Sequence, residues 1–222
     1  MPGPLRIALL GAESTGKTTL SRDLAARLRA RGHAVAVVDE VLRAWCEREG
    51  RAPRPDEAEA IAREQERQVD EARGDIVIAD TTALMVAVHA ALLFPDGEFH
   101  RFIQARQRAY GLTLLMGLDL PWVADGLQRA GPQAQAPVDA LLREQLSKAG
   151  VDWRVVYGQG AQRTDCALEA VAAVAPWAWT VAPNEAEAGR WSRLRANCEK
   201  CGDADCEHRL FTGLAGGSLP TA

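Results

Sequence analysis

The sequence predicts an α/β fold in which a five-stranded parallel sheet carries helices on both faces. Short apolar segments alternate with longer amphipathic segments along the 222 residues, as they do in doubly wound sheets. The first apolar segment, residues 5–10, runs directly into a glycine-rich loop. The composition changes after residue 176, which predicts a main domain of residues 1–176 and a small Cys- and His-rich appendage of residues 177–222.

Residues 11–18 have the sequence GAESTGKT, which fits the phosphate-loop pattern G-x-x-x-x-G-K-[ST]. Glycine allows the tight turn, and successive N–H groups then form an anion-binding nest that a helix N-terminus reinforces. Lysine reaches the β- and γ-phosphates, and the following threonine places a hydroxyl on Mg²⁺. The chain is thus predicted to be a P-loop NTPase that binds ATP and Mg²⁺. The predicted nucleotide-binding residues are Gly11, Ala12, Glu13, Ser14, Thr15, Gly16, Lys17, Thr18 and Thr19.

The composition indicates an ordinary globular protein, with 47% hydrophobic and 25% charged residues. A net charge of −4 argues against a dedicated nucleic-acid-binding protein. The longest apolar stretch, residues 83–94, contains His89 and is too short to cross a bilayer, so no membrane insertion is expected. No targeting segment is visible, which favours a cytoplasmic protein whose cysteines are reduced or bind metal. The sequence leaves the oligomeric state open.

Apolar runs predict strands at residues 5–10, 33–38, 75–82, 112–119 and 151–157. Helical periodicity predicts helices at residues 17–31, 57–73, 82–93, 98–109, 138–149 and 161–174. Asp56 is the expected N-cap of the second helix. His89 is expected to be a packed core histidine, and Cys46 and Cys166 are expected to be buried.

Two strand ends carry candidate functional groups, because ligands bind at the carboxyl ends of parallel strands. Asp39, Glu40 and Arg43 follow the second strand and are candidates for substrate contact, although the acidic residues also suit the start of a helix. Asp80 ends the third strand, as the Mg²⁺-holding carboxylate of a P-loop protein does. Its alternative role is that of a helix N-cap, and one carboxylate can serve both.

Residues 120–129 occupy the place of a lid after the fourth strand. Lids close over the phosphates, exclude water and supply a cation to the transferring group. Arg129 is the predicted cation, and the alternative is a surface loop with a packed tryptophan. Gly158 and Gly160 follow the fifth strand, where they suit either close approach to a nucleotide base or simple turn chemistry.

Three segments together resemble the ribosylnicotinamide kinase domain of the NadR type, a P-loop kinase of NAD salvage. They are GAESTGKTT at residues 11–19, Glu40-Val41-Leu42-Arg43, and the lid sequence PWVADG at residues 121–126. The resemblance covers residues 5–175 and implies transfer of the ATP γ-phosphate to the 5′-hydroxyl of nicotinamide riboside, giving nicotinamide mononucleotide. Trp122 and Asp125 are then substrate-binding residues. Where the family has the sequence D-T-D, this chain has Asp80-Thr81-Thr82 and lacks the second carboxylate. Which residues bind the metal ion is therefore open.

The predicted catalytic set is Lys17, Glu40, Asp80 and Arg129, with Thr18 and Asp80 as Mg²⁺ ligands. Glu40 or Asp39 orients or deprotonates the acceptor hydroxyl, and Asp80 is the competing base. The chain is expected to lack the DNA-binding and nucleotidyltransferase domains that full-length family members carry. Two other functions stay open: a regulatory or partner-binding P-loop ATPase, and a kinase of another nucleoside.

The appendage contains C-x₂-C-x₄-C-x-H within residues 198–208. Three thiols and an imidazole are the ligand set of a structural Cys₃His zinc site. The sequence therefore favours zinc held by Cys198, Cys201, Cys206 and His208, over incidental cysteines in a disordered tail.

Overall fold

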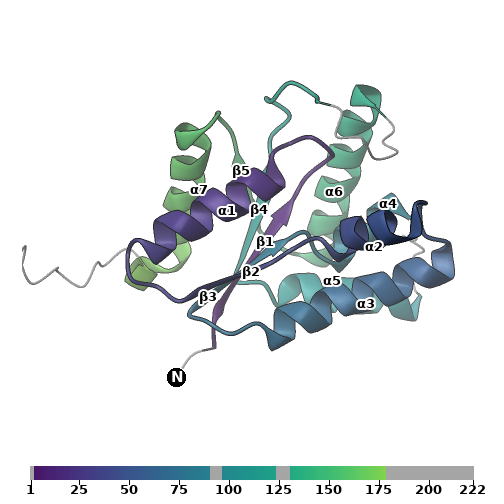
Figure 1. The fold of residues 1–222 in the computed structure, drawn as a ribbon, viewed down its shortest axis with the longest axis horizontal. Coiled ribbons are helices and arrows are strands. Elements are labelled where there is room, and N and C mark those ends of the chain that lie inside the picture. The colour runs from purple at the N-terminus through teal and green to yellow at the C-terminus, as the bar shows by residue number, and fades with distance from the viewer. Residues whose placement is uncertain (1–2, 91–96, 124–130, 179–222) are drawn as a thin grey trace, which may run out of the picture. The chain divides into compact units, whose positions relative to one another are not determined.

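The computed structural model describes residues 3–90, 97–123 and 131–178, and these form a five-stranded parallel sheet (Figure 1). The strand order is β2-β3-β1-β4-β5, so the strand that leads into the phosphate loop is central. Leu9 of β1 pairs with Asp80 of β3, and Leu10 pairs with Leu115 of β4. The strands are β1 (Leu5–Leu10), β2 (Val35–Val38), β3 (Ile76–Asp80), β4 (Leu112–Met116) and β5 (Arg154–Val156).

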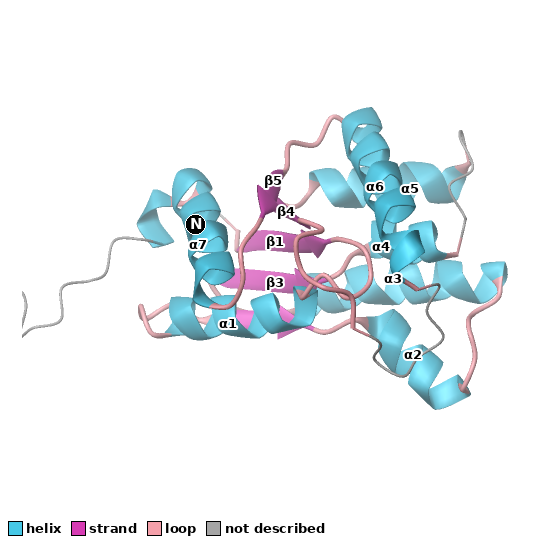
Figure 2. Cartoon of the chain, turned by 90° about the horizontal axis from the view of Figure 1, so that it is seen from above, coloured by secondary structure: helices cyan, strands magenta, loops and turns pink. Residues whose placement is uncertain are grey.

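Helices cover both faces of the sheet, as the alternation of segments predicts (Figure 2). One face carries α1 and α7, and the other carries the remaining five helices. Short 3₁₀ turns occupy Pro132–Ala134 and Pro176–Ala178. The helices are α1 (Lys17–Arg29), α2 (Val41–Glu49), α3 (Pro55–Glu71), α4 (Ala83–His89), α5 (Glu98–Arg108), α6 (Gln135–Ala149) and α7 (Ala161–Val174).

Successive side chains of β1 enter different cores because a strand alternates its faces. Ile7 and Leu9 pack with α1 and α7, whereas Leu10 packs with the helices of the opposite face. All three are fully buried. The central strands are therefore largely apolar, with Arg6 of β1 and Thr113 of β4 as polar exceptions, and Asp80 stands where β3 ends.

Some predicted boundaries are wrong for local reasons. The helix expected to begin after Asp56 begins at Pro55, because proline suits the first helical position and Glu57 closes a capping box with Arg54. The fourth strand ends at Met116 rather than at residue 119. For helix α2 the sequence indicated only a helix start at its acidic residues and gave no bounds. Residues 179–222 lie outside the described residues, so the appendage and its boundary stay predictions.

Glu66 of α3 ties three elements together from a position only 2% exposed. Its carboxylate accepts the N–H of Ala83 at 2.9 Å, the Nε of Arg106 at 3.1 Å and the hydroxyl of Tyr110 at 3.1 Å. Replacing it leaves the Ala83 N–H and the Tyr110 hydroxyl without this buried acceptor, whereas Arg106 keeps its ion pair with Asp70.

Glu66→Ala is expected to lower the free energy of unfolding by about 3–5 kcal/mol, measured by urea denaturation. Glu64→Ala is the matched control, because Glu64 lies on the same helix but forms an exposed ion pair with Arg67. The control should cost less than about 1 kcal/mol. Equal losses in the two variants would contradict this role for Glu66.

Candidate active site

The phosphate loop joins β1 to α1 at the carboxyl edge of the sheet. Gly16 has φ 79° and ends the loop at the N-terminus of α1. A Cβ at Gly11 would lie 2.7 Å from the Cβ of Met116, so only glycine lets the loop leave β1 beside β4. The Nζ of Lys17 donates to the carbonyls of Gly11 at 2.8 Å and Ala12 at 2.9 Å. The lysine therefore fixes the start of the loop.

Two further loop carbonyls are held from outside the loop. The Nε2 of Gln135 donates to the carbonyl of Glu13 at 2.8 Å, and the Nη2 of Arg163 donates to that of Thr15 at 2.9 Å. In a planar trans peptide the C=O and the next N–H point in opposite directions. These bonds therefore turn the N–H groups of Ser14 and Gly16 away from Gln135 and Arg163, as an anion-binding nest requires.

Asp80 and Thr18 form the candidate magnesium site. Asp80 is 1% exposed, and the Thr18 hydroxyl donates to its carboxylate. Among the described residues, the Oδ1 of Asp80 has no hydrogen-bond partner. Burial is the strongest influence on the pKa of Asp80 and raises it above 3.8, against the hydroxyl of Thr18 and the charge of Lys17. A buried carboxylate oxygen beside a hydroxyl fits a hard cation such as Mg²⁺.

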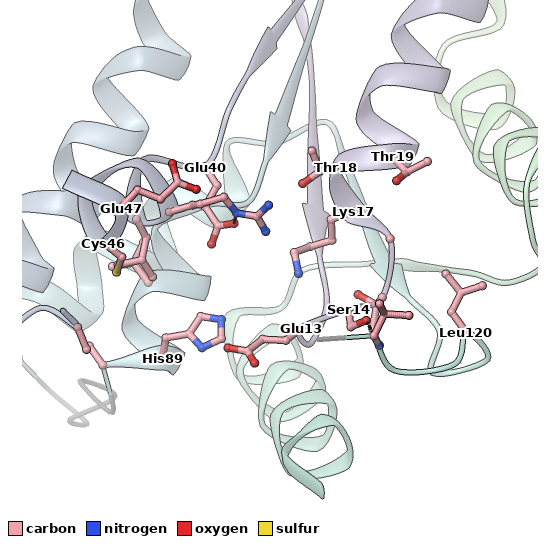
Figure 3. A pocket seen from close by; sticks show the side chains of 18 of the residues that line it. Glu13, Ser14, Lys17, Thr18, Thr19, Glu40, Cys46, Glu47, His89 and Leu120 are labelled. Atoms are coloured by element: carbon pink, nitrogen blue, oxygen red, sulfur yellow. Dashed lines mark hydrogen bonds and ion pairs between the residues drawn. The ribbon is translucent and has the colours of Figure 1, made fainter. Parts of the chain in front are cut away.

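One cavity of about 1010 Å³ joins the phosphate loop to α2 (Figure 3). Lys17 points between the two sides in that view, with Thr18, Thr19 and Ser14 on one side and Glu40, Cys46 and Glu47 on the other. We define the donor compartment by its lining residues: 13–19, Leu120, Pro121, Val123, Gln159 and Gly160. We define the acceptor compartment likewise: Glu40, Leu42, Arg43, Cys46, Glu47, residues 50–53, Val86, His89 and Ala90.

The acceptor compartment contains two glutamates, Glu40 and Glu47, and two arginines that are already paired with carboxylates. The Nε of Arg43 pairs with Glu40 at 3.3 Å, and Arg51 makes two bonds of 2.7 and 2.8 Å to Glu57. Burial raises the pKa of the Cys46 thiol, and the charges of Glu40 and Glu47 raise it further. The thiol therefore stays protonated at neutral pH, and Cys46 acts as a wall residue.

The structure corrects two expectations. His89 is exposed and lines the cavity, because α4 ends at this residue and does not continue along the sheet. Cys46 is only partly buried and lines the same cavity. Cys166 of α7 is also partly buried, packed against the core.

Other predicted site residues are placed as follows. Glu40 and Arg43 line the cavity, whereas Asp39 is exposed and lines a separate groove between α2 and α3. Trp122 is half-buried between two residues that line the donor compartment. Asp125 and Arg129 lie outside the described residues, as do the four predicted zinc ligands. No metal-binding cluster of His, Cys, Asp and Glu occurs within residues 3–90, 97–123 and 131–178.

Sequence reasoning missed three residues that hold the loop or the turn beside it: Asp119, Gln135 and Arg163. Asp119 carried a signal, since it follows a buried strand at the ligand-binding edge. Arg163 and Gln135 contact the loop across 148 and 122 residues of sequence, so no local pattern indicates them.

The fold and the phosphate loop define a P-loop nucleotide-binding protein. The model of the AAA domain family matches residues 6–163, more than half of the 222 residues, and the chain belongs to this family. None of the helices in the described part of the chain has the length and apolar character needed to cross a membrane.

Curated relatives are nucleotide kinases by name. The chain is 35% identical over 150 residues to the thymidylate kinase of Xanthomonas euvesicatoria pv. vesicatoria, covering 61% of this chain and 65% of that protein. It is 30% identical over 183 residues to the thymidylate kinase of Xanthomonas campestris pv. campestris, covering 76% and 79% respectively. These similarities support a P-loop protein of the nucleotide kinase type.

Among solved structures, NadR protein in complex with NR superposes with a TM-score of 0.62 at 22% identity. The match covers 77% of this chain and 51% of that chain. At this identity the likeness shows the fold alone. The chain thus spans about half of the NadR protein and slightly under two thirds of the first thymidylate kinase.

Proposed function

We propose that the protein transfers the γ-phosphoryl group of ATP to a hydroxyl group of a nucleoside. The observation that carries this proposal is one cavity in which the phosphate loop faces an acceptor compartment whose two arginines are already paired with carboxylates. The sequence resemblance adds the particular acceptor, nicotinamide riboside, and its product, nicotinamide mononucleotide.

The charges of the acceptor compartment favour an acceptor without a phosphate group. A phosphate monoester carries a charge of about −1.5 to −2 at pH 7 and needs cations to bind it. Both arginines in the described lining, Arg43 and Arg51, are already paired with carboxylates. The carboxylates of Glu40 and Glu47 suit sugar hydroxyls, which donate hydrogen bonds, and the positively charged ring of nicotinamide riboside.

Each site residue has a separate role in the proposed reaction. The hydroxyl oxygen of the acceptor bonds to the γ-phosphorus as the bond to the β–γ bridging oxygen breaks, and ADP leaves. Lys17 neutralises charge on the transferring group, and Glu40 orients the hydroxyl and accepts its proton. Thr18 and Asp80 would hold Mg²⁺, which would offset the negative charge of the phosphates. Arg129 is the proposed lid cation.

A second candidate is a kinase of a nucleoside monophosphate. The similarity to thymidylate kinases, at 30–35% identity, favours it. The two candidates differ in one chemical group of the acceptor, so an acceptor panel separates them.

ADP release should be measured with Mg–ATP and, in turn, nicotinamide riboside, uncharged nucleosides and thymidine monophosphate. We expect kcat/KM for nicotinamide riboside to exceed that for the monophosphate by about 100-fold. Both arginines are already paired, so binding the doubly charged phosphate without a cation costs roughly 3 kcal/mol. Faster ADP release with the monophosphate would assign the chain to nucleotide kinases instead. Steady hydrolysis that no acceptor accelerates would favour a regulatory ATPase.

A further inference from the structure

Arg163 is almost completely buried beneath the phosphate loop, at 4% exposure. It lies in the first turn of α7, which packs against α1. Its Nε has no hydrogen-bond partner among the described residues and lies 3.9 Å from the position that a Cβ on Gly16 would occupy. The guanidinium group is therefore packed directly against the loop rather than exposed to the cavity.

The two η nitrogens of Arg163 donate to four acceptors in three separate segments. Nη2 donates to the carbonyl of Thr15 in the phosphate loop at 2.9 Å and to that of Gly117 after β4 at 3.3 Å. Nη1 donates to the carbonyl of Gly158 at 2.9 Å and to Oδ1 of Asp119 at 3.0 Å. A planar guanidinium has its donors in a fixed fork, so these four acceptors are held in one geometry.

Asp119 completes the arrangement from the opposite side. Its Oδ2 accepts the N–H of Gly158 at 2.7 Å, so the carboxylate holds both Arg163 and the turn after β5. Partial burial opposes ionisation, but the bonds from Gly158 and Arg163 prevail and lower the pKa of Asp119. The carboxylate is therefore ionised at neutral pH and compensates the buried cation.

We propose that Arg163 and Asp119 form a clamp that sets the anion-binding shape of the phosphate loop and fixes it to the turn at residues 158–160. Fixing the Thr15 carbonyl orients the N–H of Gly16, which belongs to the same peptide plane. Gln159 and Gly160 of the clamped turn line the donor compartment beside the loop. Arg163 is thus a positioning residue for the triphosphate. The proposal deepens the proposed function at its donor side and rests on it only for the identity of the nucleotide.

The test is direct binding of Mg–ATP and of Mg–tripolyphosphate by calorimetry, with thermal unfolding of each variant. Tripolyphosphate has no base or sugar, so it reports on the loop alone. Arg163→Met is expected to weaken both affinities by about tenfold, because one charge-assisted bond that orients the loop is lost. Arg163→Lys should fall between Arg163→Met and the wild type, since an ammonium group keeps the charge but not the fork.

Leu168→Ala is the matched control. Leu168 is a core residue of the same helix, 1% exposed, and its truncation destabilises α7 without touching the loop. Its affinities should stay within about twofold of the wild type while its melting temperature falls. If Arg163→Met does not fold, Asp119→Asn replaces it, with a several-fold loss expected for both ligands. Unchanged affinities in Arg163→Met, or equal losses in Leu168→Ala, would overturn the proposal.

These measurements involve no acceptor. If the acceptor is not nicotinamide riboside, the binding data still test the role of Arg163. If Arg163 does not affect nucleotide binding, the acceptor panel still tests the proposed function.

Discussion

Lys17→Met is expected to lower kcat for phosphoryl transfer by on the order of 10²–10³. The lysine ammonium lies between the donor and acceptor compartments (Figure 3), where charge develops on the transferring group. The variant also loses the donor that holds the carbonyls of Gly11 and Ala12. Methionine is unbranched and only one atom shorter than lysine, so the change mainly removes the charge and its hydrogen bonds.

Single-turnover kinetics with saturating Mg–ATP measure this loss apart from nucleotide binding. Lys148→Met is the control, because Lys148 is exposed on α6 and pairs with Glu144, away from the cavity lining. A Lys17→Met enzyme that kept a tenth of the wild-type kcat would contradict the role assigned to Lys17.

Asp80→Asn is expected to reduce kcat/KM by about 100-fold or more, since a neutral amide is a poor ligand for Mg²⁺. The same change should raise the melting temperature of the ligand-free protein. The carboxylate of Asp80 is buried beside Thr18, and its burial raises its pKa above 3.8. Ionising this group at neutral pH therefore destabilises the ligand-free fold.

The sign of the pH dependence follows from the raised pKa. The folded state holds the Asp80 proton to a higher pH than the unfolded state does. The stability that the protonated carboxyl contributes is complete below pH 3.8 and is lost as pH rises through its folded pKa. Melting temperatures in chelator should therefore diverge above pH 4, with Asp80→Asn the more stable at pH 7. A difference in melting temperature between Asp80→Asn and the wild type that does not vary with pH would contradict this explanation.

The phosphate loop and Asp80 could be predicted because short-range spacing determines their geometry. Eight consecutive residues build the loop, and a buried strand that ends in aspartate delivers the carboxylate beside it through the pairing of Leu9 with Asp80. The parallel sheet followed from the same alternation of apolar and amphipathic segments.

The other contacts of the site join residues that are far apart in sequence, so no local sequence pattern predicts them. Arg163 holds a carbonyl 148 residues away. His89 was misassigned because an apolar neighbourhood predicts burial, whereas the position of the helix end decides which way the last side chain faces. Such boundaries are the least predictable feature of a sequence.

Helix α2 supplies much of the acceptor compartment from nine residues. A single glutamine fixes its start: Gln65 accepts the N–H of Val41 at 2.9 Å and donates to the carbonyl of Asp39 at 3.3 Å. The donor machinery lies on other elements, namely β1, β3, α1 and α7. Substitutions along α2 can therefore change which acceptor is held while the triphosphate cradle stays as it is. Related proteins can therefore keep the same ATP-binding residues and bind different acceptors through changes in this one short helix.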